Sequence, residues 1–125
     1  MQAKLDKIII FCADVERLVH FYRDHFGFSI LGDTDKTWTV LDTGQTQIAF
    51  HKIGDQYLSN SEAPFQADSN VKLVFQIDED LGLFRKNLLE NKVDLDEIKQ
   101  FPGYPYRTCD GRDPEGNVFQ FVEYL

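Results

Sequence analysis

The chain has 125 residues, of which 42% are hydrophobic, 14% aromatic and 27% charged. This length suits one domain with a buried core, and the composition excludes a wholly disordered chain. Because the net charge is −8, neither nucleic-acid phosphates nor an anionic membrane surface is an expected partner.

The cysteine content and the N-terminal segment indicate the compartment. Cys12 and Cys109 have neither the spacing of a metal knuckle nor the number needed for a disulfide framework. The apolar run 8–12 is too short for a signal-peptide core or a membrane span. We therefore expect a reducing, cytoplasmic setting.

The sequence contains two copies of one pattern, offset by 65 residues (7 to 72). The apolar strands predicted at 7–11 and 72–76 correspond, and the offset also aligns Leu18 with Leu83 and Phe28 with Val93. Each copy predicts a strand, a helix and three further strands.

Both predicted helices have recognisable ends. In the first copy Asp14 is a candidate N-cap, and Gly27 supplies the left-handed residue that ends the helix. The apolar stripe between them is made of Val15, Leu18, Val19, Tyr22 and Phe26. The second helix is predicted from about 80 to 90. Asn91 and Lys92 should end it less cleanly than Gly27 ends the first, although Asn tolerates the left-handed conformation.

Turn residues separate the remaining strands, and 113–117 reads as a strong chain reversal. The predicted strands are 28–31, 37–42 and 46–51 in the first copy, and 94–98, 106–109 and 118–124 in the second. The sequence thus predicts one α+β domain over 1–125. Module one is 1–51, residues 52–70 form a polar segment that is either a mobile linker or a flap, and module two is 71–125.

Alternation along the strands separates two faces in each module. One face is large and apolar and should pack on the helices, whereas the other mixes polar and apolar residues. A mixed face on a curved sheet suits a ligand cavity. The alternatives are a solvated face or a dimer interface.

Two segments resemble those of the vicinal oxygen chelate superfamily, which includes glyoxalase I, bleomycin resistance proteins and extradiol dioxygenases. Residues 8–17 (IIIFCADVER) and 21–28 (FYRDHFGF) are similar to the family's first strand and helix end. Residues 113–123 (DPEGNVFQFVE) are similar to its closing hairpin and strand. The resemblance implies two tandem βαβββ modules that form a curved mixed sheet around a cleft.

The resemblance also implies where metalloenzymes of the family hold a divalent ion. Those positions fall on Lys7, Ala49, Lys72 and Gln120. An ammonium group has no lone pair, and each lysine at about 5 Å in an effective dielectric near 20 would repel a divalent ion by roughly 6 kcal/mol. We therefore expect no metal and no cofactor.

The two lysines carry most of the functional hypotheses. If the modules pair symmetrically, Lys7 and Lys72 approach each other and favour an anionic or mixed-charge ligand, or a carboxylate partner. A neutral amine could instead act as a base or form a Schiff base with a carbonyl group. The third hypothesis is that both lysine side chains simply extend into water.

Other candidate ligand-binding residues each have a structural alternative. His51 is a weak candidate for a general base and is otherwise a packing residue, and Trp38 lines the pocket or belongs to the core. Arg107 clamps a carboxylate or forms a surface ion pair. The further candidates that complete the predicted lining are Phe11, Gln76 and Tyr106.

The favoured function is that of a metal-independent protein that binds a small molecule in a cleft lined by Lys7 and Lys72. The alternative enzyme is a lyase or isomerase that acts next to a carbonyl group, with a lysine or His51 as base. A purely structural or regulatory protein is the third possibility. A homodimer is expected because an open curved sheet exposes its edges.

Overall fold

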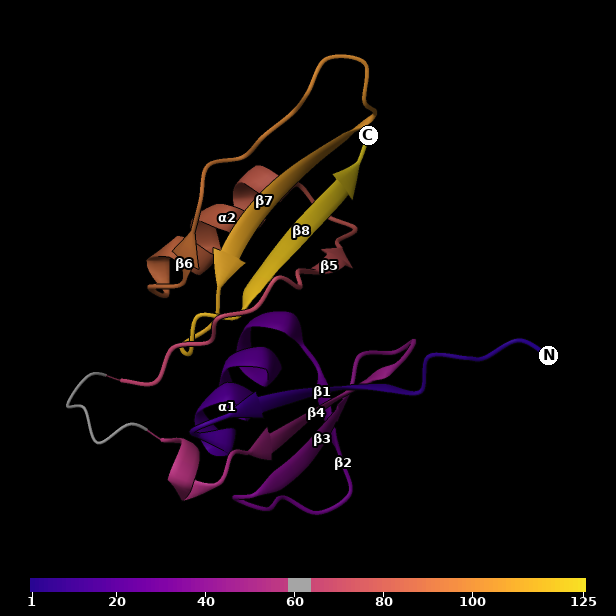
Figure 1. The fold of residues 1–125 in the computed structure, drawn as a ribbon. Helices are drawn as coiled ribbons and strands as arrows, with labels where there is room; N and C mark the ends of the chain where they lie inside the picture. The colour runs from indigo at the N-terminus through magenta and orange to yellow at the C-terminus, as the bar shows by residue number, and fades with distance from the viewer. Residues whose placement is uncertain (59–63) are drawn as a thin grey trace. The chain divides into compact units, whose positions relative to one another are not determined.

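The computed structural model describes residues 1–58 and 64–125, which form two compact units, 1–65 and 66–125. Each unit carries one helix and one four-stranded mixed sheet (Figure 1). The two tandem βαβββ modules predicted from the repeat are therefore confirmed. Part of the predicted linker 52–70, residues 59–63, lies outside the described residues.

The first unit follows the predicted order of elements. These are β1 (Lys7–Cys12), α1 (Val15–Phe26), β2 (Ser29–Leu31), β3 (Trp38–Asp42) and β4 (Gln47–Lys52), followed by a short 3-10 helix, η1 (Asp55–Tyr57). The sheet order is β1-β4-β3-β2, in which β1 runs parallel to β4 and the other neighbours are antiparallel. The parallel pair is possible because α1 supplies the crossover.

Helix α1 begins and ends where its cap residues predict. The Asp14 side chain accepts a hydrogen bond from the Arg17 N–H at 3.1 Å, and Gly27 has the left-handed φ of 73°. The helix packs on β3 and β4 through its apolar stripe. In the core below it, the rings of Tyr22 and Phe50 stack at 5.4 Å.

The second unit repeats this arrangement. Its elements are β5 (Leu73–Gln76), α2 (Leu81–Glu90), β6 (Asp94–Leu95), β7 (Tyr106–Arg112) and β8 (Val118–Tyr124). The sheet order is β5-β8-β7-β6, again with one parallel pair, β5 and β8. Helix α2 packs on β6, β7 and β8, and the rings of Phe84 and Phe121 meet edge to face at 4.8 Å.

Helix α2 begins where the sequence predicts, and its C-terminal end differs in one residue from the expectation. The Asp80 side chain accepts from the Leu83 N–H at 3.0 Å, as expected of an N-cap. At the other end Asn91 keeps a negative φ, and Lys92 instead takes the left-handed conformation with φ of 63°. The Asn91 N–H still bonds to the carbonyls of the last helical turn, so the reversal occurs one residue later than predicted.

The strands of the second unit differ from the prediction on either side of the loop 96–105. Strand β6 ends at Leu95. The chain beyond it bonds to β7 through the Asp96 N–H and the Asp110 carbonyl at 2.8 Å and through an isolated bridge between Lys99 and Thr108. Strand β7 continues to Arg112, three residues beyond the prediction. The reversal at 113–117 is as predicted, with the Asp113 N–H bonded to the Asn117 carbonyl and a positive φ at Gly116.

No helix in the described part of the chain is long and apolar enough to cross a membrane.

Candidate functional site

Each sheet has a face that points away from its helix, which we call its open face. In the first sheet this face carries Lys7, Ile9, Phe11, Trp38, Val40, Ala49 and His51, as the register and the alternation of side chains require. In the second sheet it carries Val74, Gln76, Tyr106, Thr108, Asp110, Gln120 and Val122. All predicted site residues within strands lie on open faces except Arg107.

The first open face is mainly apolar and aromatic. Phe11, on β1, is 57% exposed, and Trp38, on β3, is 36% exposed. His51 lies between them on β4, with its ring 5.3 Å from that of Phe11 and 5.7 Å from that of Trp38, both edge to face. Trp38 is thus a surface residue of the open face and does not belong to the core.

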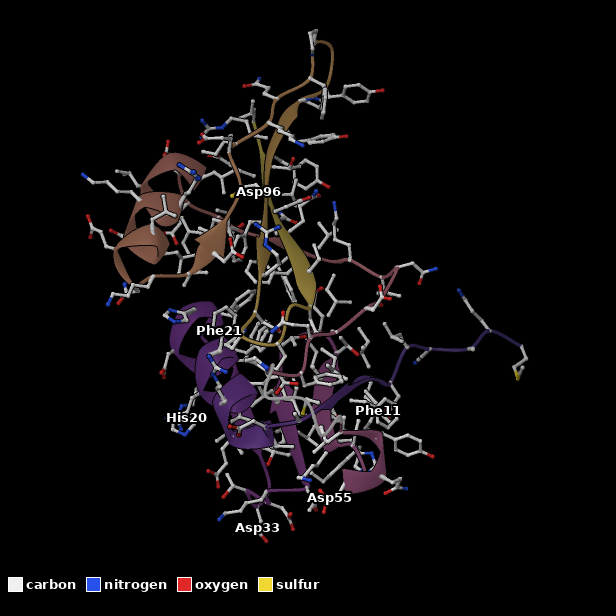
Figure 2. The ribbon with its side chains drawn as sticks, turned by 60° about the vertical axis from the view of Figure 1, so that its left-hand side comes forward. Phe11, His20, Phe21, Asp33, Asp55 and Asp96 are labelled. Atoms are coloured by element: carbon white, nitrogen blue, oxygen red, sulfur yellow. The ribbon has the colours of Figure 1, made fainter. Side chains whose placement is uncertain are left out.

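Figure 2 shows Phe11 and His20 on opposite sides of the first unit. His20 belongs to α1, as the sequence predicts, and is exposed. His51 is therefore the histidine that the fold brings to the open face.

The second open face carries a polar cluster of Lys72, Asp110 and Gln120. The Lys72 ammonium donates to Asp110 Oδ2 at 2.8 Å, and the Gln120 amide donates to Asp110 Oδ1 at 2.8 Å. Asp110 faces Gln120 across the β7–β8 ladder, and Lys72 immediately precedes β5 on the other side of β8. Two of the sequence-predicted residues, Lys72 and Gln120, therefore meet on a carboxylate.

The pKa of Asp110 reflects these contacts. Burial by itself would raise the pKa of this carboxyl group, but the hydrogen bonds from Lys72 and Gln120 outweigh burial and hold the pKa below its ordinary value. Asp110 is thus an anion at neutral pH, and its charge is balanced by the ammonium of Lys72.

A pocket of about 190 Å³ opens beside this cluster. Its lining consists of Lys72, Asp96, Glu97, Lys99, Phe101, Thr108, Asp110 and Gln120. The carboxylates of this lining are paired: Asp96 with Arg112 at 2.6 Å, Glu97 with Arg85 at 3.6 Å, and Asp110 with Lys72. Lys99 forms no direct ion pair within the described residues, although its charge helps to lower the pKa of the nearby Asp96 carboxyl group. Its ammonium is therefore the cation of the lining that has no direct carboxylate contact.

The four positions that the resemblance assigns to a metal do not fit one. Ala49 has no donor atom, and the Lys7 ammonium donates to the carboxylate of Asp6. In the second unit the Lys72 ammonium occupies the place of a cation beside Asp110, and Gln120 presents its amide hydrogens to that carboxylate. Within 1–58 and 64–125 no group of three or more histidine, cysteine, aspartate or glutamate side chains is arranged to hold a metal ion.

Lys7 and Lys72 belong to different units. Each has a carboxylate of its own unit as partner, Asp6 for Lys7 and Asp110 for Lys72. The approach of the two ammonium groups in one cleft stays a prediction.

Arg107 lies on the helix-covered face of β7, apart from the pocket. Its guanidinium donates twice to Glu123 Oε1, once from Nε at 3.0 Å, and lies 3.6 Å from Asp80. The Glu123 carboxylate also accepts from the Leu81 N–H at the start of α2. Arg107 therefore connects β7 and β8 to the N-terminus of α2. Of its two predicted roles, the structure shows the ion pair.

Three other predicted residues have less specific surroundings. Gln76 ends β5 beside Val122, and both lie on the open face. Tyr106 contacts the rings of Tyr104 at 5.7 Å and Tyr124 at 5.8 Å, at the opposite end of β7 from Asp110. Cys109 is buried, and this burial raises the pKa of its thiol, as expected of a cysteine that packs in the core.

Sequence reasoning missed Asp110, Lys99 and Phe101. The string Asp110-Gly111-Arg112-Asp113 has the composition of a turn, which placed the end of the strand before Asp110. The signal that could have found it is alternation: Asp110 follows Thr108 by two residues and precedes Arg112 by two, so all three share one face.

A family model described as the Glyoxalase/Bleomycin resistance protein/Dioxygenase superfamily matches residues 4–121. A search of curated proteins found no match. Among solved structures, the chain is similar to FosX, a genomically encoded fosfomycin resistance protein from Listeria monocytogenes. The TM-score is 0.78 at 14% identity, over 100% of this chain and 96% of that one.

Two further solved structures are similar. Lactoylglutathione lyase from Agrobacterium tumefaciens has a TM-score of 0.74 at 15% identity, over 98% of this chain and 94% of that one. TnmS3, an antibiotic binding protein from Streptomyces sp. CB03234, has a TM-score of 0.73 at 20% identity, over 99% and 98%. At these identities the likeness establishes the fold alone.

Proposed function

Because the chain belongs to the glyoxalase, bleomycin resistance protein and dioxygenase superfamily, we propose that it binds a small molecule without a metal ion at the open faces of its sheets. The observation that carries the proposal is the cluster of Lys72, Asp110 and Gln120, because an ammonium group of the chain itself balances the carboxylate beside the pocket. A divalent ion would have to displace that ammonium and then remain next to it. A ligand held by polar and apolar contacts has no such competitor.

The pocket of the second unit favours an aromatic or short apolar molecule that carries a carboxylate. Of the two lysines in the lining, Lys99 is the one without a direct ion pair among the described residues, and Phe101, 56% exposed, adds an aromatic surface. A volume of about 190 Å³ takes one ring-sized group, since whole drug-sized ligands occupy pockets of roughly 300–1,000 Å³. An anionic ligand is expected from the sequence because of Lys7 and Lys72. In this proposal the negative group of the ligand pairs with Lys99 instead.

The likeness to TnmS3 supports binding as a function that this fold can perform, since that protein is an antibiotic binding protein. The fold is equally similar to that of the lyase and of FosX, so similarity of fold does not distinguish binding from catalysis. The proposal therefore depends on the residues of the pocket.

The proposal is tested with benzoate as probe, and with benzamide as its uncharged counterpart. In the presence of EDTA, benzoate should shift the amide resonances of residues 96–101, 108–110 and 120 in a saturable way, and benzamide should bind about tenfold more weakly, because it lacks the charge that Lys99 recognises. Lys99→Gln should remove the difference between the two probes. Lys86→Gln, on the exposed surface of α2 and outside the pocket, should leave it unchanged.

Binding that disappears when EDTA is added would contradict metal independence. If neither benzoate nor benzamide shifts the resonances of residues 96–101, 108–110 and 120 in a saturable way, the proposed pocket is wrong.

A further inference from the structure

The first unit contains a larger pocket on the helix side of its sheet, away from the open face. Its volume is about 400 Å³, which lies in the range of small-molecule sites. The lining consists of Glu16, Val19, His20, Arg23, Ile30, Thr34, Asp35, Lys36 and Thr39. One wall is α1, and the other is the loop 32–37 with the adjacent strands β2 and β3.

The α1 wall has a regular construction. Glu16, His20 and Arg23 are spaced by four and three residues, so they lie along one stripe of the helix. Val19 lies within the same turns, is buried, and forms part of the apolar floor together with Ile30. In Figure 2 His20 projects from α1 on the side remote from Phe11, so this site is distinct from the open face.

The loop wall is held in one conformation by hydrogen bonds centred on Asp35. The buried Thr39 hydroxyl accepts from the Asp35 N–H at 3.1 Å and donates to the Asp35 carbonyl at 2.9 Å. One carboxylate oxygen of Asp35 accepts from the N–H and the hydroxyl of Thr37, each at 2.7 Å. These two bonds hold the pKa of Asp35 below its ordinary value, so Asp35 presents a negative charge in a fixed place.

The charges of the two walls are complementary but do not neutralise each other. Each wall carries one cation and one anion, namely Arg23 and Glu16 on α1, and Lys36 and Asp35 on the loop. Among the described residues no ion pair joins the two walls, and the ion pair recorded for Arg23 is a 3.8 Å contact with its neighbour Asp24. The lining of the pocket therefore carries two positive and two negative groups beside an apolar floor, with no ion pair between the walls among the described residues.

We propose that this pocket binds a small zwitterion, an α-amino acid or a short peptide with an apolar side chain. The ligand carboxylate would pair with Arg23 or Lys36, its ammonium with Glu16 or Asp35, and its side chain would cover Val19 and Ile30. A ligand with a single charge would pair with wall groups of one sign only and leave those of the opposite sign without a partner.

The test uses free L-leucine as probe on the full chain, with amide resonances as the readout. Leucine should shift the resonances of residues 16–23 and 34–39 in a saturable way. N-acetyl-leucine, which lacks the ammonium, and leucine methyl ester, which lacks the carboxylate, should each bind about tenfold more weakly, since each loses one charge-assisted contact.

Variants of the wall separate recognition from general surface charge. Removing both cations, with Arg23→Gln and Lys36→Gln together, should weaken leucine about tenfold and leave the methyl ester unaffected. Removing both anions, with Glu16→Gln and Asp35→Asn together, should also weaken leucine and leave N-acetyl-leucine unaffected. Arg17→Gln, on the same helix but outside the lining, should change nothing. Equal affinity for leucine and both masked analogues, or shifts that leave these residues unaffected, would overturn the proposal.

Discussion

Lys7 and Lys72 occupy corresponding places in the two modules, but their surroundings differ. The partner of Lys7 is its sequence neighbour Asp6, whose side chain is 77% exposed, whereas the partner of Lys72 is Asp110, whose side chain is 25% exposed. Exposed ion pairs contribute little to stability because solvent screens them. Of the two lysines, only Lys72 has a partner whose charge the fold partly shields.

Asp110→Asn should therefore lower the free energy of unfolding in a pH-dependent way. The folded-state pKa of Asp110 is depressed, so its stabilisation is fully present above the unfolded-state pKa and is lost as the pH falls through the folded-state value. The loss should be about 1 kcal/mol near pH 7 and approach zero once the pH is below the folded-state pKa of Asp110. Urea titrations at a series of pH values measure it, and a loss that does not vary with pH would contradict this explanation.

Asp6→Asn is the matched control. Its effect on the free energy of unfolding should be unmeasurable at every pH, because the Asp6 carboxylate is solvated.

The enzyme alternative makes a separate prediction at Lys72. An ammonium group that is hydrogen-bonded to a carboxylate is not a nucleophile, so Lys72 should not form a Schiff base with an added aldehyde at neutral pH. Borohydride trapping followed by peptide mass mapping checks this. A stoichiometric adduct at Lys72 would favour the lyase or isomerase over the binding protein.

At the scale of elements, the cap residues were the most informative part of the sequence. Asp14 caps its helix as predicted, because an N-cap depends only on a side chain and the next three residues, and Asp80, at the predicted start of the second helix, caps it in the same way. Strand ends were less predictable. The extension of β7 to Arg112 depends on its pairing with β8 and β6, and the ion pairs of Arg112 with Asp94 and Asp96 accompany that pairing.

The candidate site shows the same division between local and long-range information. Lys72 and Gln120 could be assigned to one face from alternation within their own strands. Alternation also places Asp110 on the face of Thr108, but only if the strand continues past Cys109, and that depends on its pairing with β8. The place of Lys99 depends on the bridge that closes the loop 96–105. Arg107 was ambiguous for a further reason: its partner Glu123 lies 16 residues away, on the adjacent strand.

The capping bond of α1 can be tested by Asp14→Ala. The substitution removes the acceptor for the Arg17 N–H and should lower the free energy of unfolding by about 1 kcal/mol. Asp33→Ala, which removes an exposed carboxylate of the loop after β2, should have no comparable effect. Equal effects of the two substitutions in urea titrations would contradict the capping role.

At the scale of the whole molecule, both open faces expose apolar side chains. Ile9 and Phe11 are 44% and 57% exposed in the first unit, and Val74 is 53% exposed in the second. Apolar side chains gathered on one face of a sheet are typical of surfaces that another chain or a ligand covers.

The homodimer expected from the sequence stays a prediction. Sedimentation velocity at micromolar concentration should show a species of twice the chain mass of 14.5 kDa. A single species of 14.5 kDa at that concentration would contradict it.

Metal titration followed by calorimetry tests most directly whether amines have replaced the electron-pair donors of a metal site. The chain should bind none of Ni²⁺, Zn²⁺, Mn²⁺ or Fe²⁺ stoichiometrically, whereas a variant with Lys7→His, Ala49→Glu, Lys72→His and Gln120→Glu should bind one ion per chain. Stoichiometric binding by the unsubstituted chain, lost in Asp110→Asn, would contradict the account.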